Sequence, residues 1–216
     1  FDKKIRQMLV EVKARYKASC VARLYLAADL GGCGLKSIRD SLEEATIYSW
    51  AYLCTRKDLK GSLNLFVSMS KRTKRSVISD SESVLRAYDI TTELDLLQAT
   101  VTANGVQYSE ARPLARYVVN KMRADNNTSR HKEWEIKELG GRVIHSTSSI
   151  DKVHSFAWLR AGKLSSLAVR NVIAAQEGCL LTRTHPALKH VGGNTCRACR
   201  KSPETIEHVM TGCSVW

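Results

Sequence analysis

The sequence has few prolines, few aromatic residues and few acidic residues, and it has no long hydrophobic run. Its 216 residues include three prolines and twelve glycines, a content that argues against collagen-like or low-complexity structure. No stretch approaches the ~18 apolar residues of a membrane span, so we do not expect a membrane protein. With 44% hydrophobic and 25% charged residues, the chain can bury a core. Because the first residue is Phe1, we interpret the chain as a fragment or a processed piece.

The shortage of acidic residues leaves a large excess of positive charge. Lysine and arginine number 34 against 21 aspartates and glutamates, which gives a formal net charge of +13. Basic residues gather at 3–17, 56–60 and 71–75, and residues 178–203 hold five basic residues and no acidic one. Such clusters are typical of proteins that neutralise nucleic-acid phosphates. Charge alone leaves two alternatives open, a solvated surface and binding to anionic lipid.

Hydrophobic periodicity indicates a mainly α-helical fold. Apolar residues at helical spacing predict helices over residues 3–20, 35–53, 113–122, 131–139, 151–162 and 164–180. Ser37 or Asp40 is a possible cap of the second helix, and Pro113 fits the first turn of the third. We also expect an exposed basic connector at 68–83, a short helix from 91 to 97 and a loop at 125–129. A short strand at 143–144 is the single β candidate. Trp50 and Trp134 are expected to be core residues. Five apolar residues near the end are also predicted to be core: Trp158, Leu159, Leu164, Ile173 and Ala174.

Three cysteines and one histidine near the end of the sequence have the spacing of metal ligands. Two residues separate Cys196 from Cys199, eight lie between Cys199 and His208, and four lie between His208 and Cys213. Three thiolates and one imidazole suit a tetrahedral Zn²⁺, and four protein ligands leave no open position for chemistry. We therefore predict a structural zinc site on these four residues, with a helical turn over 205–210 that presents His208. Ordinary thiols and a surface histidine are the alternative interpretation.

The other cysteines and histidines fit this site less well. Seven cysteines are an odd number, which does not suggest a disulfide framework. We expect the remaining four to be small core residues or free thiols: Cys20, Cys33, Cys54 and Cys179. His185 and His190 could substitute as ligands, but their spacing is less suitable.

Catalytic motifs are scarce. The acidic residues Asp89, Glu93 and Asp95 are interpreted as solvated helix-cap charges rather than as acid–base catalysts. The glycine-rich segment 31–34 lacks the lysine and the serine or threonine of a phosphate-binding loop. We interpret it as a tight turn that returns Leu30 and Leu35 to one core.

The end of the chain resembles one protein family. Residues 196–199, 203–208 and 212–213 resemble the post-polymerase region of non-LTR retrotransposon reverse transcriptases, in the group that carries a restriction-like endonuclease. Residues 23–40 are similar to the segment that follows the thumb in this family, and residues 151–183 match its next stretch. The resemblance covers almost the whole chain and is weakest over 55–145.

The chain departs from the family pattern at three positions. The family often has proline where Ala27 and Ser214 stand, and arginine where Cys33 stands. None of these positions is a predicted zinc ligand. The polymerase motif of a tyrosine followed by paired aspartates is absent, and so are the endonuclease carboxylates.

The resemblance implies a fragment of an RNA-directed DNA polymerase and endonuclease that has no catalytic residue of its own. Its partners would be element RNA or target DNA and the polymerase and endonuclease domains, in the nucleus after synthesis in the cytoplasm. Four segments are expected: a post-thumb segment at 1–54, a helical linker at 55–148, a helical subdomain at 149–190 and the zinc knuckle at 191–216.

The leading functional hypothesis is therefore a nucleic-acid-binding, non-catalytic segment that acts during target-primed reverse transcription. A protein-interaction adaptor with a structural zinc, and a host-recruited remnant, are the alternatives. Basic residues beside the knuckle and around the glycine turn are predicted to contact phosphates: Arg197, Arg200, Lys201, Arg183, Lys189, Arg23, Lys36 and Arg39.

Overall fold

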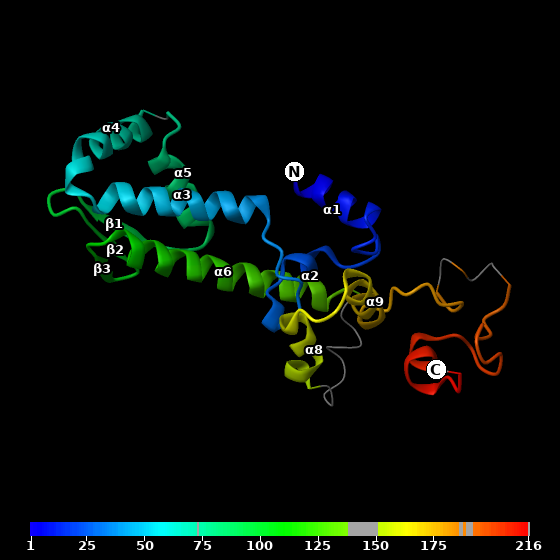
Figure 1. Ribbon diagram of the computed structural model, residues 1–216. Coiled ribbons are helices and arrows are strands. Elements are labelled where there is room, and N and C mark those ends of the chain that lie inside the picture. The colour runs from blue at the N-terminus through cyan, green and yellow to red at the C-terminus, as the bar shows by residue number, and fades with distance from the viewer. Residues whose placement is uncertain (73, 138–150, 186–187, 189–191, 216) are drawn as a thin grey trace. The chain divides into compact units, whose positions relative to one another are not determined.

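The computed structural model describes residues 1–72, 74–137, 151–185, 188 and 192–215 (Figure 1). These residues are mainly helical, as predicted, and also include one small β-sheet. The chain divides into two compact units, one formed by Phe1–Leu35 with Ser129–Trp216 and the other by Lys36–Thr128. The four-segment division expected from the sequence stays a prediction. The candidate strand at 143–144 lies outside the described residues.

Three helices open the second unit, and serine caps define where two of them begin. They are α3 (Ile38–Thr55), α4 (Lys60–Lys71) and α5 (Val77–Ala87). Ser37 Oγ accepts a hydrogen bond from the Asp40 amide at 3.0 Å, so Ser37 rather than Asp40 is the cap of α3. Ser76 and Ser79 exchange side-chain and backbone hydrogen bonds in a capping box. The exposed connector expected at 68–83 is therefore wrong, because most of that segment belongs to α4 and α5.

A three-stranded antiparallel sheet follows, with strands in the order β1 (Thr92–Asp95), β2 (Thr100–Ala103) and β3 (Val106–Tyr108). Asn104 and Gly105 join β2 to β3 with φ of 46° and 82°, the left-handed conformation that a tight two-residue hairpin requires. The helix expected from 91 to 97 is wrong. Its Leu94 pairs with the fully buried Val101 of β2, so pairing with the neighbouring strand outweighs the local helical pattern.

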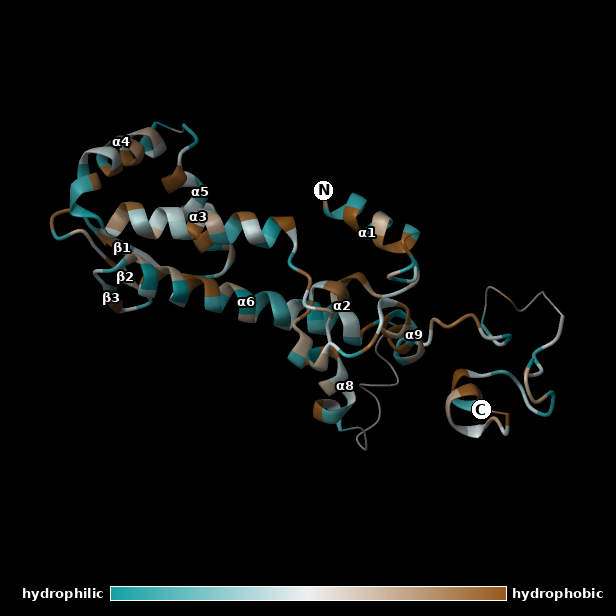
Figure 2. Ribbon diagram, viewed as in Figure 1, coloured by the Kyte–Doolittle hydropathy of each residue, from teal (hydrophilic) through white to brown (hydrophobic). Residues whose placement is uncertain are grey.

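The longest helix, α6 (Ala111–Glu135), begins in the second unit and ends in the first. Pro113 lies in its first turn, as predicted. The loop expected at 125–129 is wrong, because the polar residues there continue the helix. Thr128 Oγ1 donates to the Ala124 carbonyl at 2.9 Å, so the hydroxyl group finds its hydrogen-bond partner within the helix. Hydrophobic and hydrophilic residues occur together along the length of α6 (Figure 2).

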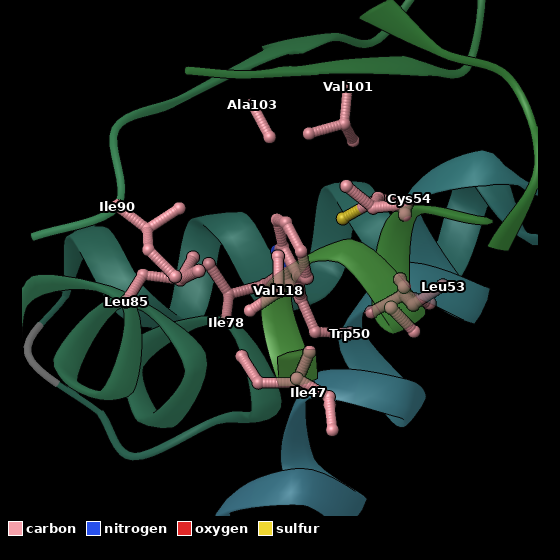
Figure 3. Packing of buried hydrophobic residues seen from close by; sticks show 14 of the residues in the cluster. Ile47, Trp50, Leu53, Cys54, Ile78, Leu85, Ile90, Val101, Ala103 and Val118 are labelled. Atoms are coloured by element: carbon pink, nitrogen blue, oxygen red, sulfur yellow. The ribbon is translucent and has the colours of Figure 1, made fainter. Parts of the chain in front are cut away.

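The core of the second unit draws on α3, α4, α5, α6 and the sheet. Figure 3 shows many of its side chains pointing toward one another around Trp50. Trp50 is 5% exposed, which confirms its predicted place in the core. The fully buried members are Ile47, Ala51, Cys54, Val101, Ala103, Leu114, Ala115 and Val118.

The first unit is built from shorter helices. They are α1 (Asp2–Glu11), α2 (Val21–Tyr25), a helical turn at Ala28–Leu30, the end of α6, α8 (Lys152–Ala161), α9 (Ser166–Gln176) and a last turn at His208–Gly212. The helix expected over 3–20 ends early, because Lys13 adopts a left-handed φ of 58°. The core here is a small cluster formed by Cys20, Ala22, Leu26, Trp134 and Phe156.

The glycine-rich turn at 31–34 packs closely against this small core. A Cβ atom on Gly32 would lie 2.0 Å from the carbonyl oxygen of Leu26, a distance that no side chain could tolerate. The Cys33 and Gly34 amides donate to the carbonyls of Arg23 and Leu26, each at 2.9 Å. The segment is a turn, as predicted, but Leu30 and Leu35 are 38% and 36% exposed and do not return to a core.

The core predicted around α8 and α9 is confirmed in part. Ile173 and Ala174 are buried, whereas Leu164 is 42% exposed and lies outside the core. Trp158 is half-buried, and its indole Nε1 donates to the Ser155 carbonyl at 2.8 Å. The buried aromatic residue of α8 is Phe156, two positions earlier, and the predicted core residue Leu159 is partly buried and packs against the same cluster.

Candidate metal centre and its basic surroundings

The structure brings the four predicted metal ligands together. One ligand atom from each of Cys196, Cys199, His208 and Cys213 lies within 4.8 Å of all the others. Cys196 Sγ is 3.9 Å from Cys213 Sγ, and Cys199 Sγ is 3.2 Å from His208 Nε2. These residues could hold a metal ion. The ring nitrogen of His208 that faces the cluster is therefore Nε2.

Two backbone features create this arrangement. The Cys196 amide donates to the Ser202 carbonyl at 2.7 Å, and the Arg200 amide donates to the Cys196 carbonyl at 3.0 Å. Arg200 has a left-handed φ of 56°, which turns the chain back tightly after Cys199. On the other side, Thr205 Oγ1 accepts from the His208 amide at 3.0 Å and begins the predicted helical turn that presents the imidazole.

The separation of 3.9 Å between the Cys196 and Cys213 sulfurs matches that of a tetrahedral metal site. Zn–S bonds of about 2.3 Å place two sulfur ligands about 3.8 Å apart across a tetrahedron. Backbone amides favour the thiolate form of two of the cysteines, because the Cys199 amide lowers the pKa of Cys196 and the Lys201 amide lowers the pKa of Cys199. Burial and the neighbouring Cys196 and Cys199 raise the pKa of Cys213. The thiolate is the form that binds metal. The donor set and its geometry thus fit one tetrahedral ion.

A buried carboxylate, Glu204, connects the segments on either side of the cluster, and no sequence pattern indicated this role. Glu204 is 3% exposed and accepts the amides of Arg197 at 2.7 Å and of Arg183 at 3.2 Å. The Arg197 guanidinium also donates to both of its oxygens and lowers the pKa of Glu204 to about 2. Because Glu204 follows directly after the acid-free segment 178–203, a count confined to that segment missed it.

The basic residues beside the knuckle differ in their surroundings. Arg200 and Lys201 are exposed and form no ion pair with any described residue. Arg197 is paired with Glu204, although 57% of its side chain is exposed. Arg183 is half-buried, and its Nη1 donates to the Thr195 carbonyl at 3.3 Å. Lys189 lies outside the described residues.

The prediction that Arg23 lies on a phosphate-binding strip is wrong. Arg23 is 1% exposed, and its guanidinium carbon lies 4.6 Å from the centre of the Trp134 ring. Its Nε donates to the Gly31 carbonyl at 2.9 Å, Nη2 donates to Gln176, and Nη1 lies 3.7 Å from Glu177 Oε1. The side chain is therefore internal to the first unit and cannot reach a phosphate backbone.

Lys36 and Arg39 belong to the second unit and are both ion-paired. Lys36 pairs with the buried Glu44, which also accepts two hydrogen bonds from Arg123 at 2.8 and 2.9 Å. Arg39 pairs with Glu43 one helical turn away, and 77% of its side chain is exposed. Each remains accessible, but part of its charge is already compensated.

The remaining cysteines agree largely with their predicted role. Cys20, Cys54 and Cys179 are buried and free, as expected of small core residues. Cys33 is a free thiol with an exposed side chain. Within the described residues, no further cluster of histidine, cysteine and carboxylate groups has a metal-binding arrangement.

Comparisons of the chain with models of protein families, with curated proteins and with solved structures gave no match. The resemblance to retrotransposon reverse transcriptases therefore stays a prediction. Among the described helices, none has both the length and the apolar character that crossing a lipid bilayer requires.

Proposed function

We propose that this chain is a nucleic-acid-binding, non-catalytic segment of a non-LTR retrotransposon reverse transcriptase and endonuclease. In this role it holds template RNA or target DNA during target-primed reverse transcription, next to the polymerase and endonuclease domains and in the nucleus. The observation that carries the proposal is the assembled Cys196, Cys199, His208 and Cys213 cluster, whose order along the chain is the one that the resemblance implies.

The ion in this cluster is proposed to be Zn²⁺. Three sulfur donors and one imidazole favour zinc over the hard cations calcium and magnesium, which prefer oxygen ligands. Four protein ligands complete the tetrahedron, so the ion is structural rather than catalytic. Its role is to hold the turn between Cys196 and Cys199 together with the helical turn that carries His208.

Arg200 and Lys201 are the basic residues best placed for phosphate. They follow Cys199 directly, so the metal and the left-handed turn at Arg200 fix the backbone from which their side chains extend. Both are exposed, and no described carboxylate compensates their charge. Arg183 and Arg197 lie beside them but are held by the Thr195 carbonyl and by Glu204, so they contribute mainly to the shape of the knuckle.

The test is the salt dependence of binding to single-stranded RNA and to duplex DNA. Removing two phosphate contacts, in the double variant Arg200→Ala/Lys201→Ala, should reduce the slope of log affinity against log salt by about 1.4–1.8. A matched control, Lys3→Ala/Lys4→Ala, removes the same charge from exposed positions on α1. Equal slopes in the two double variants, with metal bound in both, would contradict the proposed surface.

A protein-interaction adaptor is the second candidate, and exposed apolar residues of α3 favour it. Leu42, Tyr48 and Tyr52 are 65%, 45% and 49% exposed on this helix. An apolar interface would bind a protein partner with little dependence on salt, whereas phosphate binding weakens steeply as salt is added. The salt titration therefore separates the two functions. A host-recruited remnant would share the binding properties of the first candidate.

A further inference from the structure

A cavity in the first unit is lined by an unusual combination of residues. It has a volume of about 260 Å³ and lies between the segment that follows α1, α2 and α9, which are neighbours in Figure 1. Most of its wall is apolar, with Leu9, Leu24, Leu164, Val169 and Ile173 among the lining residues. Mostly apolar cavities with a few placed polar groups are the usual form of a ligand site.

The charged groups of this wall are mainly cationic. Arg15, Arg23 and Arg170 line the cavity together with a single carboxylate, Glu177. Arg15 donates to the Ser19 carbonyl, and Arg170 donates to the Lys13 carbonyl at 3.2 Å, so backbone contacts hold both side chains. The cavity therefore favours a ligand with an anionic group.

The buried ion pair leaves one donor and one acceptor unused. Arg23 Nη1 and Glu177 Oε1 lie 3.7 Å apart, each is inaccessible to solvent, and neither has a hydrogen-bond partner. The other oxygen of Glu177 accepts from the Cys20 amide at 3.2 Å. Buried polar atoms are nearly always hydrogen-bonded, so an unpaired donor beside an unpaired acceptor requires an explanation.

An aromatic ring completes the wall. The guanidinium carbon of Arg170 lies 4.6 Å from the centre of the Tyr16 ring, and the Tyr16 hydroxyl donates to Asn171 Oδ1 at 3.4 Å. This stack holds a flat surface and a positive charge together at the cavity. Unpaired bases in single strands are bound by such aromatic and arginine planes.

We propose that this cavity receives one unpaired base of a bound single strand, with its neighbouring phosphates at Arg15 and Arg170. The inference rests on the proposed nucleic-acid-binding function and names a site for it away from the metal cluster. The edge of a base offers a donor and an acceptor side by side. Glu177 Oε1 and Arg23 Nη1 are covered in this structure, so the two side chains have to separate before they can accept from and donate to that edge. A fatty acid would supply the negative charge but not this pair of hydrogen bonds.

The test compares strands of about ten abasic sugar-phosphates that carry either no base or one central base. Because both strands have the same phosphates, their ratio of affinities isolates the base. We expect the single base to increase affinity about tenfold, with an unchanged salt slope. Four strands, with uracil, cytosine, adenine or guanine, show which base edge is preferred. A free nucleoside monophosphate that competes equally well would instead identify a small-molecule site and overturn the strand proposal.

Two variants on α9 test whether the gain in affinity from the single base arises in the cavity. Val169→Phe fills it and should reduce the affinity ratio to about one, whereas Leu167→Phe adds a ring at a position that does not line the cavity and should preserve the ratio. Thermal unfolding checks that both variants are folded. Should Val169→Phe not fold, a single photoreactive 5-iodouracil base on the unaltered chain should cross-link to residues 9–33 or 164–177.

The outcomes separate this inference from the proposed function. Tight binding of both strands with equal affinity, or cross-links confined to other residues, would overturn the base site and leave nucleic-acid binding intact. No binding of any strand, abasic or not, would overturn both.

Discussion

Glu204 offers the sharpest test of how the metal cluster is built. Its carboxylate accepts the Arg197 amide, next to the ligand Cys196, and the Arg183 amide from a separate stretch of chain. Glu204→Gln keeps the size of the side chain and removes its charge. An amide NH₂ group then faces N–H donors, and the charge-assisted hydrogen bonds from Arg197 are lost. The backbone that carries Cys196 should become less well fixed.

The magnitude follows from the hydrogen bonds involved. Each hydrogen bond to a charged group contributes about 1.5–3 kcal/mol, and part of this is kept by the remaining carbonyl oxygen of glutamine. Residues that position the ligands of a metal site typically change metal affinity by about 10–100-fold when they are altered. We therefore expect Glu204→Gln to weaken zinc binding by about 10–100-fold, or about 1.4–2.7 kcal/mol.

The assay is competition for Zn²⁺ with a chromophoric chelator at pH 7. Glu207→Gln is the matched control, because it removes the same charge from an exposed residue three positions further on. If the lost charge acted only through general electrostatics, it would weaken zinc binding equally in both variants. Equal zinc affinities for Glu204→Gln and Glu207→Gln would refute the claim that Glu204 positions the ligands.

Two further predictions address the metal and the second unit. Cys199→Ser should abolish the stoichiometric binding of zinc and the protection of residues 195–213 from hydrogen exchange. The reason is that structural zinc contributes the folding energy of such small sites. Full zinc content in this variant would contradict the assignment of Cys199 as a ligand. Glu44 should make the second unit acid-sensitive. Hydrogen bonds from Arg123 lower the pKa of Glu44, so its contribution to stability is present above the unfolded pKa of about 4.3 and is lost as pH falls through the lower folded pKa. The protection factors of the amides in α3 should therefore fall below about pH 4.3 in the parent chain and much less in Glu44→Gln, whose protection is already lower at pH 7. Identical pH profiles of protection would refute this coupling.

The features predicted best from the sequence were those with a local physical signal. The spacing of Cys196, Cys199, His208 and Cys213 was sufficient because metal ligands close in sequence must also be close in space. Ser37 as a helix cap and Pro113 in a first turn depend on hydrogen bonds within a few residues. Such local signals do not depend on contacts with distant parts of the chain.

The errors came where distant contacts decide local structure. Thr92–Asp95 has a helix-like pattern but forms a strand, because β2 supplies its hydrogen-bond partners. Residues 68–83 are polar enough for a connector, yet Ser76 and Ser79 begin a helix there whose buried face includes Ile78 and Leu85. Composition alone could not reveal these partners.

Arg23 shows why the basic residues were harder to assign than the metal ligands. Its charge is compensated by Glu177, far away in the sequence, and its side chain stacks on Trp134 of α6. The apolar neighbours of Arg23 in residues 20–26 favour its burial, but they do not show which carboxylate compensates its charge. A count of charges measures the total available to a polyanion, but the partners of each side chain decide which charges are free. In this chain the nearby Glu204 compensates the charge of Arg197 and leaves those of Arg200 and Lys201 uncompensated, so the turn that follows Cys199 presents a smaller basic surface than the sequence suggested.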